Sequence, residues 1–80
     1  MTKDIRIDFN EVGHDNVATT LVSSAAPGVD LSIGAPLVAG DGYGNLCEAT
    51  VESVKDGVVI LLLDPGTFRA ASPHGALATA

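Results

Sequence analysis

The stretch that decides the fold is residues 46–63, which read LCEATVESVKDGVVILLL. Asp56-Gly57 lies between two runs that are rich in β-branched and apolar residues, and Asp-Gly in that setting is the strongest short-range signal for a β-hairpin. Glycine adopts a positive φ without a steric penalty, and aspartate tolerates it. We therefore predict a central hairpin with strands at residues 46–54 and 58–63.

Two registers of this hairpin are open. A two-residue loop places Val59, Leu61 and Leu63 beside the two glutamates of the first strand, whereas a three-residue loop that includes Lys55 places residues 58, 60 and 62 there. The opposite face of the first strand carries small side chains that suit a crowded interior: Cys47, Ala49, Val51 and Ser53. That face is the predicted core face. Residues 58–63 do not alternate with polar residues, so both faces of this strand are expected to be covered.

The chain of 80 residues is expected to form a single small β domain over residues 1–80. Its large aromatic residues are Phe9, Tyr43 and Phe68, and it has no tryptophan. One cysteine excludes an internal disulfide, and Cys47 is expected to be a buried thiol. Small domains gain stability from disulfides, metals or oligomerisation. Oligomerisation is therefore the expected source here.

The formal net charge is −6, from ten acidic residues against four basic ones. Nucleic-acid binding requires clustered lysine and arginine, and the four cations are dispersed, so direct binding to nucleic acid or to an anionic membrane is not expected. The first residues contain no apolar run of signal-peptide length, and the longest apolar run, residues 58–63, is too short to span a bilayer. A protein made in the cytosol is the expectation.

The first 12 residues have two interpretations. Ile5, Ile7 and Phe9 alternate with Arg6 and Asp8, a pattern typical of a half-buried strand. The same pattern fits an arm over residues 1–12 that becomes a strand only by adding to the sheet edge of a partner.

The rest of the chain reads as short strands between turns. Residues 17–22 and 36–39 are predicted strands, residues 23–35 a long loop, and residues 40–45 and 64–67 turns. Residues 70–80 are weakly patterned and are expected to form a loosely structured tail. The predicted fold class is all-β: a small, mainly antiparallel β-barrel or β-tulip-like domain with long loops and little helix.

No group of residues predicts catalysis or metal binding. The loop from Asp41 to Asn45 lacks the length and the closing glutamate of an EF-hand and the Gly-Lys-Ser/Thr of a P-loop. His14-Asp15 has no nucleophile motif beside it, and the spacing of Cys47, His14 and His74 matches no zinc pattern. Two carboxylates on one strand, Glu48 and Glu52, are more often solvated or at the rim of an interface. We expect no enzyme activity, no metal and no cofactor.

Residues 36–69 resemble the lambda-type family of phage head-decoration proteins, small subunits that cement assembled capsids. The resemblance rests on Pro36-Leu37 at the start of a strand, on Gly44-Asn45-Leu46 before the central strand, and on Gly66-Thr67-Phe68-Arg69 after the apolar strand. Weaker similarities lie at residues 14–19 and 75–77. The chain lacks the tryptophan that this family has near residues 47 and 48.

The resemblance implies a virion protein on the capsid exterior, made in the host cytoplasm, that trimerises and binds the major capsid protein through an N-terminal arm. The expected partner-binding residues are Ile5, Ile7, Phe9, Val59, Leu61, Leu63 and Phe68. The alternative from the residues alone is a cytoplasmic, SH3-like small β-barrel that acts as a protein-interaction module, because five short strands with glycine-rich turns fit that class as well.

Overall fold

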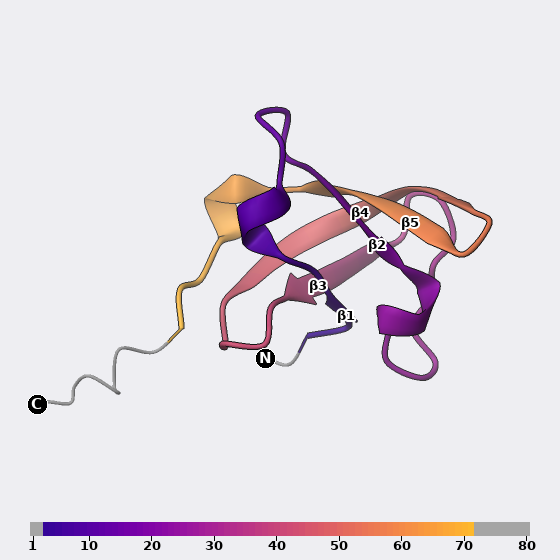
Figure 1. Ribbon diagram of the computed structural model, residues 1–80, viewed down its shortest axis with the longest axis horizontal. Coiled ribbons are helices and arrows are strands. Elements are labelled where there is room, and N and C mark those ends of the chain that lie inside the picture. Colours follow the sequence, from indigo (N-terminus) through magenta and orange to yellow (C-terminus); the bar gives the residue numbers. More distant parts are fainter. Residues whose placement is uncertain (1–2, 72–80) are drawn as a thin grey trace, which may run out of the picture.

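The hairpin is the centre of a five-stranded sheet in the computed structural model (Figure 1). Strands β4 (Leu46–Lys55) and β5 (Val58–Leu63) pair antiparallel. β3 (Pro36–Gly40) pairs antiparallel with β4, and β2 (Val17–Leu21) pairs antiparallel with β5. β1 (Ile5–Arg6) runs parallel to β3, so the strand order is β1-β3-β4-β5-β2.

The structure describes residues 3–71. Within this range the remaining regular structure is three 3-10 turns, η1 (Phe9–Glu11), η2 (Val22–Ser24) and η3 (Pro65–Thr67). The described part of the chain is therefore built from strands and short turns, which confirms the predicted all-β class. The mixed sheet curls into a half-barrel.

The turn at the tip of the hairpin has two residues, as one of the two registers predicts. Asp56 and Gly57 have φ values of 54° and 80°, and positive φ at both central positions is the signature of a type I′ turn. Val54 lies opposite Val59, and Lys55 lies opposite Val58.

A bulge then changes the register. Ser53 pairs with Ile60 but Val51 pairs with Leu61, so Glu52 is the extra residue. From this point Val51, Ala49 and Cys47 share a face with the odd-numbered residues of β5. Neither of the two regular registers is therefore correct along the whole hairpin.

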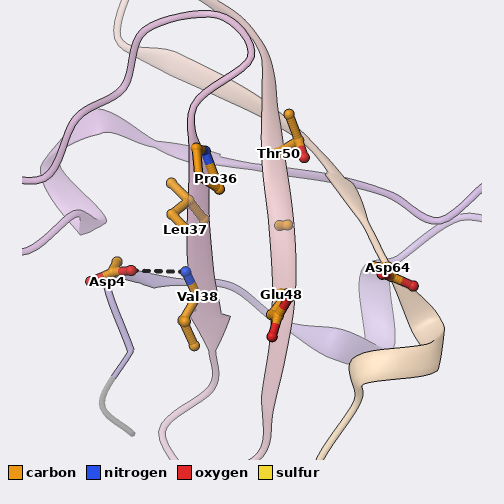
Figure 2. Close-up of a pocket in the computed structure, with 8 residues that line it drawn as sticks. Asp4, Pro36, Leu37, Val38, Glu48, Thr50 and Asp64 are labelled. Carbon is orange, nitrogen blue, oxygen red and sulfur yellow. Dashed lines mark hydrogen bonds between the residues drawn. The ribbon is translucent and has the colours of Figure 1, made fainter.

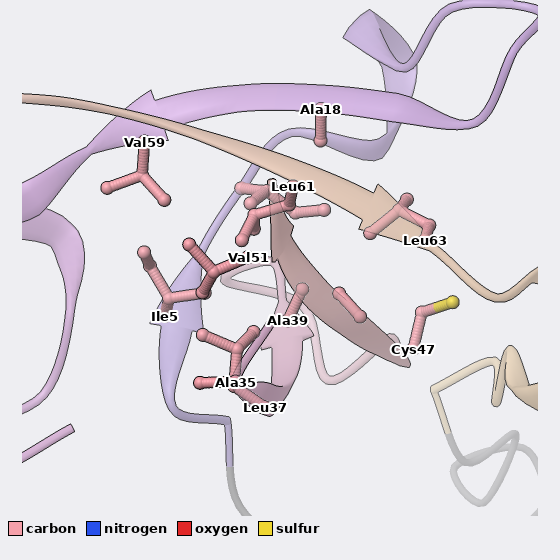
Figure 3. Packing of buried hydrophobic residues seen from close by; sticks show 12 residues of the cluster. Ile5, Ala18, Ala35, Leu37, Ala39, Cys47, Val51, Val59, Leu61 and Leu63 are labelled. Atoms are coloured by element: carbon pink, nitrogen blue, oxygen red, sulfur yellow. The ribbon is translucent and has the colours of Figure 1, made fainter. Parts of the chain in front are cut away.

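The core lies on the concave face of the curled sheet (Figure 3). Of the four small residues that the sequence placed on the core face of β4, Cys47, Ala49 and Val51 are buried in the same cluster as Val59 and Leu61. Ser53 was placed there wrongly, because it lies beyond the bulge and pairs with the outward Ile60. The complete cluster is Ile5, Ile7, Ala18, Ala35, Leu37, Ala39, Cys47, Ala49, Val51, Val59, Leu61 and Leu63. Burying an aliphatic side chain contributes about 1.5–3 kcal/mol, so the aliphatic residues of the hairpin and β1 carry much of the stability.

The curl brings the two edge strands of the sheet together. The Thr20 hydroxyl of β2 donates a hydrogen bond of 2.7 Å to the carbonyl oxygen of Arg6 in β1. Beyond η2, Ala25 forms an antiparallel bridge with Ile5, and the N–H of Ala26 donates to the carbonyl of Asp4 (2.7 Å). Side-chain and local backbone contacts therefore link the open sides of the half-barrel.

The N-terminal segment, for which a strand and an arm were both open, is a part of the core. Ile5 and Ile7 are 1% and 5% exposed, and the parallel pairing of β1 with β3 holds this segment in the sheet. Of the two interpretations of residues 1–12, the strand is therefore correct for Ile5 and Ile7 and the detached arm is not, because both side chains are buried in the core cluster. Phe9 follows in η1, so the predicted alternation ends there.

The long loop and the tail agree with the predictions only in part. Val29 and Leu31 pack against the core from the loop, whereas Ile33 is 76% exposed. After η3, Arg69 bridges Leu46, and the N–H of Ala71 donates to Asn45 Oδ1. The rest of the predicted tail lies outside the described residues.

Candidate interaction surfaces

The convex side of the sheet carries apolar side chains on two adjacent strands. On β5 the residues that alternate with the buried ones point outward, and on β2 the neighbours of the buried Ala18 do the same. Leu21 and Leu62 are 53% and 41% exposed, and the others are half-buried. We call this surface the outer face of β2 and β5; it consists of Val17, Leu21, Val58, Ile60 and Leu62.

Strand register arranges this surface in rows. Ile60 lies between Thr19 and Ser53, and the next row places Leu62 between Val17 and Thr50. The residues of these two central rows on β2 and β5 are uncharged, and Glu52, the exposed extra residue of the bulge, lies beside them on β4 between Thr50 and Ser53. At the hairpin end, the row of Leu21 and Val58 continues to Lys55 on β4. Apolar side chains on two strands beside polar and charged ones on the next strand are typical of a protein interface with a polar rim.

At the other end of β4 the convex side is acidic. A shallow depression of about 340 Å³ is lined by Asp4, Glu48 and Asp64, together with residues of β3 and β4 (Figure 2). Asp4 Oδ2 accepts a hydrogen bond from the Val38 N–H (2.8 Å), which also satisfies a backbone donor at the edge of β3. The convex side is therefore polarised, with a cation at the hairpin tip and carboxylates at the far end.

A second apolar surface lies at the end of the half-barrel where η1 and η3 meet (Figure 1). The rings of Phe9 and Phe68 pack edge to face, with centroids 5.3 Å apart and planes at 89°. Both rings line a cavity of about 240 Å³, together with Val12, Leu63 and Pro65.

The structure separates the seven expected partner-binding residues into two groups. Five are in the core and cannot reach a partner in this structure: Ile5, Ile7, Val59, Leu61 and Leu63. Phe68 is 47% exposed and Phe9 is partly buried, and these two lie together at the end of the half-barrel. The correction for β5 is that its even-numbered residues face outward, because the Glu52 bulge turns the odd-numbered ones toward the small residues of β4.

The residues considered for chemistry are dispersed or are occupied by local hydrogen bonds. In the β3–β4 turn, Asp41 accepts hydrogen bonds from the N–H groups of Tyr43 (2.8 Å) and Asn45 (3.0 Å) and from Asn45 Nδ2 (2.6 Å). Partial desolvation raises the pKa of Asp41, but these three hydrogen bonds outweigh it and leave the pKa below its ordinary value. The Asp41 carboxylate therefore stabilises the β3–β4 turn, in which it lies.

Cys47 and His14 do not approach each other in a metal-binding arrangement. Cys47 is buried, with Sγ 3.1 Å from the carbonyl oxygen of Asp64, and His14 is exposed in the turn before β2. Among residues 3–71 no three histidine, cysteine, aspartate or glutamate side chains are grouped so that they could hold a metal ion. His74 lies outside the described residues.

No helix in the described part of the chain has the length and apolar character needed to cross a membrane. Comparisons with protein-family models, with curated proteins and with solved structures found no match.

Proposed function

We propose that this chain is a structural binding subunit that decorates a phage capsid and stabilises it by burying surface against neighbouring proteins. The observation that carries the proposal is the outer face of β2 and β5. The resemblance of residues 36–69 to head-decoration proteins supplies the identity of the assembly.

The outer face fits a role in assembly because it exposes apolar side chains to water. A small domain that works alone is more stable with polar residues at such positions. Leu21 and Leu62 remain about half exposed although the core of the same sheet is well filled. Removing such side chains from water contributes roughly 25 cal/mol per Å² of apolar surface, so a partner that covers this face would add stability that the domain lacks alone.

The acidic composition also fits attachment to protein rather than to nucleic acid. The net charge of −6 repels the phosphate backbone, and the three acids of the depression gather at one end of the convex side. In this proposal the subunit recognises neighbouring proteins by shape, apolar contact and the position of its charges.

Co-sedimentation tests the proposal. The purified chain is mixed with empty, expanded phage heads. We expect saturable binding, and weaker binding of Leu62→Asp than of Tyr43→Asp, a matched variant at an 83%-exposed position in the β3–β4 turn. A chain that stays wholly in the supernatant would defeat the proposal.

A further inference from the structure

We propose that the cavity lined by Phe9 and Phe68, at the end of the half-barrel, takes one aromatic side chain of the capsid protein that has lysine or arginine beside it in its chain. The inference rests on the proposed function, from which it takes the partner, and it adds a contact apart from the outer face of β2 and β5. We call this cavity the aromatic socket; its lining is Phe9, Val12, Asn16, Cys47, Leu63, Pro65 and Phe68.

The first reason is the size and the apolar lining of the socket. Five of its seven lining residues are apolar, and the Cys47 thiol already donates to the carbonyl oxygen of Asp64 (3.1 Å). The volume of about 240 Å³ exceeds the roughly 150 Å³ of an engineered apolar cavity that binds benzene. The socket therefore has room for one aromatic side chain.

The second reason is that the walls of the socket are held in place within the chain. Phe9 and Phe68 pack edge to face, 5.3 Å apart, and this geometry leaves further ring faces and edges for a third aromatic group. The Phe68 N–H donates to the Pro65 carbonyl (3.2 Å), which fixes the backbone of the wall at η3, yet the side chain is 47% exposed. A wall that is already ordered loses little conformational entropy when a partner binds.

The third reason is the charge around the socket. Four of its lining residues are directly preceded in the chain by an exposed acid, and Cys47 is directly followed by one. The single basic neighbour in sequence is Arg69. These acids, half of the ten in the chain, are Asp8, Glu11, Asp15, Glu48 and Asp64.

Three of these carboxylates are fixed by the turns that surround the socket. Asp8, Asp15 and Asp64 each accept, through Oδ1, the backbone N–H two residues further on, at 2.9, 3.2 and 3.2 Å. An aromatic side chain with basic neighbours complements this arrangement, whereas one with acidic neighbours is repelled.

The same charges argue against a second copy as the occupant. The one aromatic residue of the chain outside the socket is Tyr43, and its turn carries Asp41 and no basic residue. The position of the socket fits the capsid protein instead. Glu48 and Asp64 also line the depression on the convex side (Figure 2), so one partner can contact the outer face and the socket together.

Three blocked tripeptides test the chemistry of the occupant. Lysine-tryptophan-lysine, glutamate-tryptophan-glutamate and lysine-alanine-lysine are titrated into the ¹⁵N-labelled wild-type chain at low salt. We expect saturable amide shifts at residues 9–12, 16 and 63–68 with the first peptide, binding of the second that is about 10-fold weaker, and no saturable shifts there with the third. Concentration-dependent shifts of the same residues without peptide would assign the socket to a second copy and overturn the proposal.

A matched pair of double variants tests the charges. Asp8→Asn/Asp64→Asn keeps an acceptor for both backbone N–H groups and should weaken binding of lysine-tryptophan-lysine about 3- to 10-fold. Asp30→Asn/Asp56→Asn makes the same change in net charge away from the socket and should change binding less than about 2-fold. Equal effects of the two variants would overturn the charge complementarity.

Co-sedimentation with empty heads separates this contact from the proposed function. Phe68→Ala should weaken binding to heads about 10-fold or more, as the loss of a buried aromatic contact does, whereas Tyr43→Ala, which removes an 83%-exposed ring, should leave it within about 2-fold. The peptide titration uses the wild-type chain, so it decides the case if Phe68→Ala folds poorly. Heads that bind the Phe68 variant and the wild type equally, or peptides that leave the socket unshifted, would overturn the socket and leave the proposed function intact. A chain that binds the basic peptide but ignores heads would do the reverse.

Discussion

Val51 lies opposite Leu61 across β4 and β5, one residue out of step with the register that the Asp56-Gly57 turn sets. The extra residue is Glu52, and its place in a bulge lets the small residues of β4 and the large ones of β5 share the core. Without the bulge, the register of the turn would place Glu52 against Leu61, inside the half-barrel.

Deleting Glu52 should therefore be tolerated better than deleting Thr50, two positions away. The first deletion removes the bulge and leaves all other pairs of β4 and β5 in place. The second leaves no register that keeps both Glu48 and Glu52 out of the core, and an unpaired buried carboxylate costs about 3 kcal/mol or more. Urea unfolding followed by circular dichroism compares the two; equal losses would contradict the role of the bulge.

The N-terminal segment should behave as a core strand. Ile5→Ala should lower the free energy of unfolding by about 2–5 kcal/mol, because it empties a site that is 1% exposed. Ile33→Ala makes the same chemical change at a 76%-exposed position, and its effect should stay within about 0.5 kcal/mol. Deletion of residues 1–10 should accordingly unfold the domain; a folded, stable truncated chain would show that the segment is an arm after all.

Thr67 should stabilise the junction of β4 with η3 through its hydroxyl. Its Oγ1 accepts from the Glu48 N–H (2.9 Å) and donates to the Asp64 carbonyl (2.7 Å). Thr67→Val keeps the shape but leaves the Glu48 N–H without this acceptor, which should cost about 1 kcal/mol in thermal unfolding. Thr67→Ser retains the hydroxyl and should lose less, so a Ser variant that is as unstable as the Val variant would assign the effect to packing.

Asp41 should contribute to the loss of stability in acid. A carboxylate whose pKa is lowered in the folded state stabilises the fold above its unfolded pKa, about 3.8, and this contribution disappears as the pH falls through the lower, folded value. Asp41→Asn should be less stable than wild type at pH 7, and the difference should shrink below about pH 4. Unfolding midpoints measured from pH 7 to pH 2 give the comparison; a constant difference would exclude the carboxylate as its cause.

The sequence was sufficient for the strand class, for the position of the hairpin and for the core face of β4 as far as Val51. Asp56-Gly57 marks the tip of the hairpin but left a two-residue and a three-residue loop open, and the small residues at 47, 49 and 51 suit a crowded interior. The outer face was not predictable in the same way, because residues 58–63 are apolar on both sides and only the bulge decides which side is inward. The one sequence signal for a bulge at Glu52 is indirect. A regular register would set this glutamate beside the apolar Leu61.

The two interpretations of the N-terminal segment could not be separated for a different physical reason. The alternation of Ile5, Ile7 and Phe9 is the same for a core strand and for a donated arm. What distinguishes them is the parallel pairing with Ala39 and Gly40, a long-range contact that local pattern cannot encode. The cavity at Phe9 and Phe68 depends likewise on η1 and η3 meeting across the fold.

The most direct test of the account is the thiol reactivity of Leu62→Cys in a Cys47→Ala background, measured with a chromogenic disulfide before and after the chain is bound to empty heads. We predict free-thiol reactivity for the chain alone and strong protection of the bound chain, while Tyr43→Cys in the same background reacts equally fast in both states. Equal reactivity of position 62 with heads absent or bound would contradict the claim that a partner covers the outer face.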